Sequence, residues 1–122
     1  MNKKIQSFTD LVVWRKGHAL VLDIYKVTKT FPKEERYSLV DQMRRCAVSI
    51  TSNIAEGFNR QGKREKVQFY YTALASCTEL QNQLLVAKDV GYLDSKIFKE
   101  FAQLTVEVNK LLNGLIRSVK NG

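Results

Sequence analysis

The sequence has few of the residues that turns, metal sites and membrane spans require. One proline and six glycines in 122 residues are too few for the many turns of a β-sandwich and favour long helices. No apolar run approaches the length of a membrane span, and no apolar segment of a signal peptide follows the charged N-terminus. We therefore expect a cytoplasmic protein that does not insert into a membrane.

Histidine and cysteine are also scarce. His18 is the single histidine and has no glutamate three residues before it, unlike the ligand motif of metal-binding bundles. We interpret it as a partly buried residue of the first helix. Cys46 and Cys77 lack metal-ligand spacing and fall within apolar patterns, which predicts two reduced core thiols. The sequence thus indicates no metal and no cofactor.

Motifs for catalysis are absent too. No glycine-rich phosphate loop, nucleophile elbow or cysteine–histidine pair occurs in the chain. Ser49 and Ser52 have no base within helical reach. Glu56 and Glu79 form a carboxylate pair at most, and Arg60 follows Glu56 by four residues, which favours a simple ion pair. We expect no catalytic residues and no enzyme activity.

What the sequence does contain is helical periodicity over a length typical of one domain. Residues 42–57, QMRRCAVSITSNIAEG, carry an apolar face and, nearly opposite, a small polar face. The apolar face is formed by Met43, Ala47, Ile50 and Ile54, and the polar face by Arg45, Ser49, Ser52 and Glu56. The small residues indicate close packing against a neighbouring helix or subunit.

Four helices are expected, at about residues 10–31, 38–58, 63–90 and 95–119. Thr9 or Asp10 is a cap for the first helix, and Pro32 predicts its end at residue 31. Ser38 is the expected N-cap of the second helix, with Asp41 completing a shortened capping box.

Gly91 is expected to end the third helix in a left-handed conformation. Asp94 or Ser95 then caps the fourth helix. Short connections favour antiparallel neighbours, so the predicted fold is all-α, an antiparallel up-down-up-down four-helix bundle forming a single domain over residues 1–122. The apolar stripes are wider than an internal core needs, which favours a homo-oligomer.

Basic residues are in excess, since twenty Lys and Arg oppose twelve Asp and Glu for a net charge of +8. The excess is concentrated after the second helix, where the candidate phosphate-binding residues are Arg60, Lys63, Arg64 and Lys66. Arg44 and Arg45 are second candidates, although Asp41 can partly neutralise either. Phe69, Tyr70 and Tyr71 could stack on bases, but we interpret them as core residues.

These residues resemble a known family. The motifs that carry the resemblance are FTDLVVW (8–14), FPKEERYSL (31–39), QMRRCAVSITSNIAEG (42–57), KDVGYL (88–93) and LNGLI (112–116). The chain is similar to the four-helix-bundle proteins encoded in intervening sequences of bacterial 23S ribosomal RNA genes, with Cys46 and Thr51 where Ala and Pro are more usual. The resemblance implies a closed homo-oligomer, most simply a pentamer. It also extends to the basic accessory protein of diversity-generating retroelements, which is thought to bind nucleic acid and a reverse transcriptase.

Charge and resemblance together predict a non-catalytic, homo-oligomeric protein that binds RNA, DNA or a hybrid non-specifically through phosphate contacts. The expected partners are other copies of the chain, a nucleic acid and, in the competing interpretation, an acidic protein. In that interpretation the protein is an interaction scaffold with no role in nucleic-acid binding. An enzyme is the third and weakest interpretation.

Overall fold

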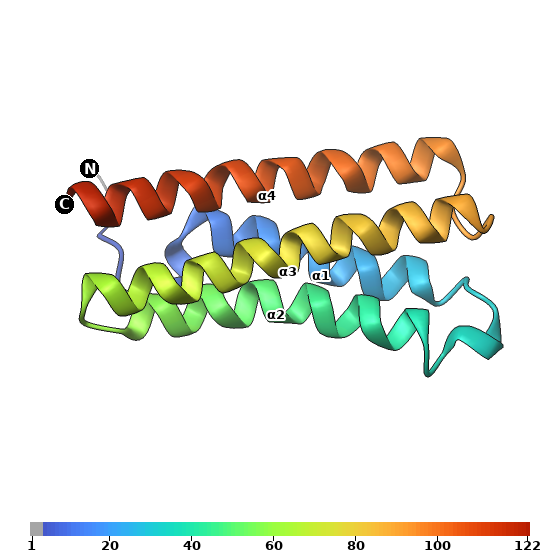
Figure 1. The fold of residues 1–122 in the computed structure, drawn as a ribbon, viewed down its shortest axis with the longest axis horizontal. Helices are drawn as coiled ribbons and strands as arrows, with labels where there is room; N and C mark the ends of the chain where they lie inside the picture. The colour runs from blue at the N-terminus through green and yellow to red at the C-terminus, as the bar shows by residue number, and fades with distance from the viewer. Residues whose placement is uncertain (1–3) are drawn as a thin grey trace.

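The protein is an antiparallel four-helix bundle, as predicted. The computed structural model describes residues 4–122, and each helix runs opposite to the one before it (Figure 1). The helices are α1 (Val12–Thr28), α2 (Leu39–Asn59), α3 (Lys63–Asp89) and α4 (Ser95–Asn121), with short 3-10 turns η1 (Phe8–Asp10) and η2 (Lys33–Glu35). Each helix packs against the next, and α1 closes the bundle against α4. No strand occurs among the described residues.

The apolar face predicted on α2 is the centre of the core. Met43, Ala47, Ile50 and Ile54 are all fully buried. The other helices bury aliphatic and aromatic side chains against them, including Leu20, Ile24, Tyr70, Leu80, Leu84, Val108 and Leu112. Burial of each large apolar side chain contributes about 1.5–3 kcal/mol, so this seam supplies the main drive to fold.

The predicted ends of the first helix are wrong by two to three residues, since α1 begins at Val12 and ends at Thr28 rather than covering 10–31. Neither Thr9 nor Asp10 is its N-cap. Ser7 and Asp10 instead form a reciprocal capping box around η1, and an extended residue, Leu11, separates η1 from α1. Pro32 disfavours a helical conformation only at the residue before it, so α1 ends earlier than the proline alone requires.

The predicted cap of α2 is only partly correct. Ser38 does occupy the N-cap position, but its side chain makes no capping hydrogen bond. Its backbone carbonyl accepts from the N–H of Gln42 at 3.0 Å, so the helix starts through main-chain bonding. The predicted starts of α3 and α4 are correct, and the remaining bounds differ from those observed by one or two residues, which is the usual uncertainty of helix ends.

The turn between α3 and α4 follows its predicted chemistry. Gly91 has φ +94°, the left-handed region that side chains other than hydrogen disfavour. The N–H of Tyr92 donates to Ala87 O at 2.8 Å and that of Gly91 to Lys88 O at 3.0 Å, which together form a Schellman motif. Asp94 caps α4 by accepting from the N–H of Ile97 at 2.8 Å.

α2 and α3 approach closely through small residues. A Cβ on Gly57 would lie 2.6 Å from a ring carbon of Tyr70, so only glycine fits there without movement. About two turns earlier on α2, the hydroxyl of Ser49 lies 2.8 Å from that of Ser76 on α3. Of the polar face of α2, Ser49 therefore packs against α3, whereas Arg45, Ser52 and Glu56 are exposed.

His18 is exposed, so its interpretation as a partly buried residue is wrong. Its ring stacks on Trp14 with centroids 4.7 Å apart and planes at 12°. His18 lies on the outward side of α1, as does Tyr25, one of the exposed large side chains of this helix. No helix within residues 4–122 has the length and apolarity needed to cross a bilayer.

Candidate nucleic-acid interface

The six predicted phosphate-binding residues lie in two separate places. Residues 60, 63, 64 and 66 lie where α2 turns into α3, at the end of the bundle that also holds the C-terminus of α4 (Figure 1). Arg44 and Arg45 lie in the first turns of α2, about 22 Å away along the helix axis at 1.5 Å per residue. The structure therefore does not combine them into one surface.

Lys66 is already engaged within the bundle. Its ammonium donates to the carbonyl oxygens of Phe58 at 2.6 Å and Gly57 at 3.3 Å. Both carbonyls belong to the last turn of α2, where the Gly57 oxygen also accepts from the backbone N–H of Arg60 at 3.2 Å. Lys66 closes the C-terminus of α2, and its selection as a phosphate contact is not supported by this geometry.

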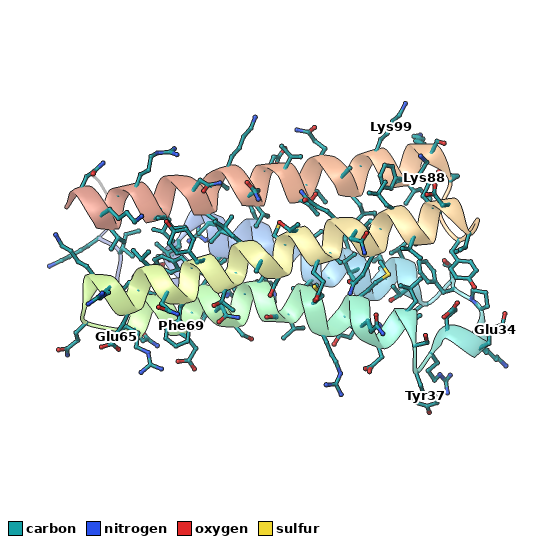
Figure 2. All side chains as sticks on the ribbon, viewed as in Figure 1. Glu34, Tyr37, Glu65, Phe69, Lys88 and Lys99 are labelled. Carbon is teal, nitrogen blue, oxygen red and sulfur yellow. The ribbon has the colours of Figure 1, made fainter. Side chains whose placement is uncertain are left out.

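Arg60 is partly neutralised. Its guanidinium pairs with Glu56 at 3.1 Å, as the spacing of four residues suggested, and lies 4.8 Å from the ring centroid of Phe69. Figure 2 shows Phe69 and Glu65 at this end of the molecule. Arg60 remains exposed at its position after α2, but an anion would have to compete with the Glu56 carboxylate.

Lys63, Arg64 and Lys120 surround one hollow of about 400 Å³ at the side of α3. Arg64 is exposed and has no ion pair among residues 4–122. Lys63 donates to the main-chain oxygen of the last residue, Gly122, and Lys120 donates to the hydroxyl of Tyr71 at 2.8 Å. The Tyr71 hydroxyl is a neutral oxygen, so the positive charge of Lys120 is not cancelled by this bond.

Lys120 was not selected from the sequence. The signal that could have found it is topological, because the last turn of α4 in an antiparallel bundle must return to the α2–α3 end. A basic residue near that terminus then adds to the charge of Lys63 and Arg64. The site is thus assembled from two helices, whereas the sequence motif covered only one connection.

Arg44 and Arg45 have different environments. Arg44 donates to the hydroxyl of Thr28 at 3.0 Å and to Tyr25 O at 3.3 Å, and its guanidinium lies 4.6 Å from the Tyr25 ring centroid. It therefore joins α2 to the C-terminus of α1. Arg45 has an 81% exposed side chain and pairs with Asp41 at 3.2 Å, which leaves it a solvated surface residue.

The three consecutive aromatic residues also differ. Tyr70 is 2% exposed and belongs to the core, as predicted. Phe69 is half-buried beneath Arg60. Tyr71 is 48% exposed, so its interpretation as a core residue is wrong. Its position on α3 points it towards α4 rather than into the seam with α2, as its contact with Lys120 shows.

The two cysteine thiols, which could suggest catalysis, are buried and hydrogen-bonded within the bundle. Cys46 donates to Ser76 O at 3.0 Å and to a carboxylate oxygen of Glu79 at 3.1 Å. Burial, with a further contribution from Glu79, raises the pKa of Cys46 to about 12, and burial raises that of Cys77 to about 11. Both cysteines are free and buried, as predicted. No group of three or more potential metal ligands occurs in residues 4–122.

Comparison with known proteins gives the family. Residues 9–114 match the family described as 23S rRNA-intervening sequence protein. The chain belongs to this family. The matched region includes the α2–α3 turn with Arg60, Lys63 and Arg64, but it ends before Lys120.

A solved structure supports the fold of this family member. It is the crystal structure of a Bacteroides thetaiotaomicron protein of unknown function from the S23 ribosomal protein family. The two chains superpose with a TM-score of 0.81 at 23% identity, over 87% of this chain and 96% of the other. A search of curated proteins finds no match. The likeness establishes the four-helix architecture and, at this identity, no further property.

Proposed function

We propose that the protein is a non-catalytic homo-oligomer that binds nucleic acid non-specifically, through phosphate contacts at the α2–α3 end of each bundle. The observation that carries the proposal is the position of Lys63, Arg64 and Lys120 around one hollow. Arg64 contributes a planar guanidinium without an internal carboxylate partner, which suits the paired oxygens of a phosphate.

The charge of the whole chain supports the same ligand. A net charge of +8 draws polyanions towards the protein, and release of their counterions then supplies most of the binding free energy. Phosphate contacts carry no sequence information by themselves. The expected binding is therefore non-specific and weakens steeply as salt rises.

Self-association would multiply this one weak site. Large apolar side chains are exposed on two helix flanks, with Leu22 at 55% on α1 and Leu85 at 45% on α3. Such residues support burial against other copies, and the family resemblance makes a pentamer the expected assembly. Several linked basic ends would bind one nucleic acid with a raised effective concentration.

The test is fluorescence anisotropy with a short labelled RNA and the matching DNA over a salt series. Arg64→Ala should weaken binding and reduce the salt slope by about 0.7 for a single-stranded ligand. Lys99→Ala is the matched control, since Figure 2 places Lys99 near the opposite end of the bundle and its removal subtracts the same charge. Light scattering on the same samples gives the mass of the oligomer.

Two results would overturn the proposal. One is the absence of binding to any nucleic acid at low salt, and the other is an equal loss in the two variants, which would leave only general charge attraction. A protein recovered equally well before and after nuclease treatment, together with no RNA binding, would instead establish the scaffold. A monomeric mass would remove the homo-oligomer from the proposal.

A further inference from the structure

The hollow at the α2–α3 end is both basic and aromatic. Its volume of about 400 Å³ lies in the range of small-molecule sites, about 300–1,000 Å³. Its walls are formed by Lys63, Arg64, Val67, Gln68, Tyr71 and Lys120. A surface that only attracted phosphates would not need an apolar wall, so the arrangement indicates a ligand with one charged part and one flat apolar part.

The ring of Tyr71 is held at its hydroxyl while nearly half of the residue stays exposed. The Lys120 ammonium lies 2.8 Å from the phenolic oxygen but 5.2 Å from the ring centroid. It therefore sits beyond the hydroxyl edge of the ring rather than above its centre. The hydrogen bond from Lys120 orients the ring. Because Tyr71 is 48% exposed, the ring can still contact a second flat group.

The charged and aromatic parts of the wall are aligned along α3. Arg64 and Tyr71 are seven residues apart, which places them on the same side of the helix and separates them by about 10 Å along its axis. The Gln68 side chain lies between them and offers both an amide donor and an acceptor. A phosphate at Arg64 thus leaves a base within reach of Tyr71 and Gln68.

We propose that this hollow binds one unstacked nucleotide of a single strand, with its base on Tyr71 and its phosphate at Arg64 and Lys63. This inference rests on the proposed function and makes it more specific. A base inside a duplex is covered on both faces by its neighbours, so only a single strand or a strand end presents a free face. The protein therefore prefers single strands to duplexes of the same length.

The experiment compares Tyr71→Ala, Tyr71→Phe and Lys99→Ala by anisotropy on a labelled oligouridylate and on an RNA duplex of equal length. Tyr71→Ala should weaken single-strand binding by about 5- to 100-fold and leave duplex binding as in the control. Tyr71→Phe keeps the stacking ring and should retain most of the single-strand affinity. The Tyr71 side chain is exposed, so its removal should leave the fold intact, and circular dichroism checks this.

A second measurement locates the base directly. Irradiation of the wild-type protein with iodouridine-substituted RNA should give a crosslink at Tyr71, identified by mass spectrometry. An equal affinity of Tyr71→Ala and wild type for the single strand, with no crosslink at Tyr71, would overturn the nucleotide pocket. If Arg64→Ala still weakens binding in that case, phosphate recognition at Arg64 is supported and only the nucleotide pocket is lost. If no variant binds and wild type does not either, the proposed function itself fails.

Discussion

The ammonium of Lys66 lies 2.6 Å from the carbonyl oxygen of Phe58, so the second turn of α3 closes the last turn of α2. Lys66→Met keeps the aliphatic stem near the Phe58 ring but removes the donor. We expect the free energy of unfolding to fall by about 1 kcal/mol, as urea denaturation would measure.

The same variant separates structure from ligand binding. Lys66→Met should bind RNA as the Lys99→Ala control does, because the ammonium is not offered to solvent phosphates. A loss of RNA affinity as large as that of Arg64→Ala, without a change in stability, would show instead that Lys66 contacts the phosphate.

Arg44 and Arg45 provide a matched pair on consecutive positions. Arg44→Met removes the bonds to Thr28 and to the Tyr25 carbonyl and should lower the free energy of unfolding by about 1–2 kcal/mol. Arg45→Met removes an exposed ion pair and should change it by less than about 0.5 kcal/mol. Equal effects in thermal unfolding would contradict the anchoring role of Arg44.

Gly57→Ala tests the close approach of α2 and α3, and Gly114→Ala on α4 is its control. Gly57→Ala places a methyl group against the Tyr70 ring and should destabilise the bundle by about 1–3 kcal/mol. Gly114 lies within α4, where an added Cβ would meet an Arg117 nitrogen no closer than 3.8 Å. Gly114→Ala should therefore stabilise by about 0.5–1 kcal/mol, and opposite shifts in melting temperature are the expected result.

How much the sequence revealed depended on the range of the interaction. The core face of α2 and the left-handed Gly91 were predictable, because periodicity and backbone conformation are local properties. The roles of Lys66 and Arg44 were not, because each binds carbonyl groups of a different helix. A basic residue looks the same in sequence whether it binds a phosphate or a helix terminus.

The candidate site shows the same limit. Lys63 and Arg64 were found from local charge, whereas Lys120 joins them only after the antiparallel fold returns α4 to their end. Tyr70 and Tyr71 are adjacent in sequence, yet one is 2% and the other 48% exposed. A shift of one residue turns a helical side chain by about 100°, so Tyr70 packs against Gly57 of α2 while Tyr71 lies towards Lys120 of α4.

Gln83 tests the cost of a buried polar group. Its side-chain oxygen is buried and has no hydrogen-bond partner among the described residues, while the residue as a whole is 7% exposed. Gln83→Met keeps a similar length and removes the unpaired oxygen, so it should raise the free energy of unfolding by about 1–3 kcal/mol. A decrease in denaturant midpoint would mean that the amide has a stabilising partner, such as water or another copy.

Cys46 and Cys77 should make stability depend on alkaline pH. Their folded pKa values of about 12 and about 11 lie above the ordinary thiol value of 9.0, so the folded chain retains protons that the unfolded chain releases. The thiols have no effect below pH 9.0, and above it each lowers the free energy of unfolding by up to about 1.4 kcal/mol per pH unit. Other groups also titrate there, so wild type is compared with the Cys46→Ala, Cys77→Ala double variant. The free energy of unfolding of wild type minus that of the double variant should be constant from pH 7 to 8 and should fall from pH 9 to 10. Parallel curves throughout would show that the thiols ionise equally in the folded and unfolded states.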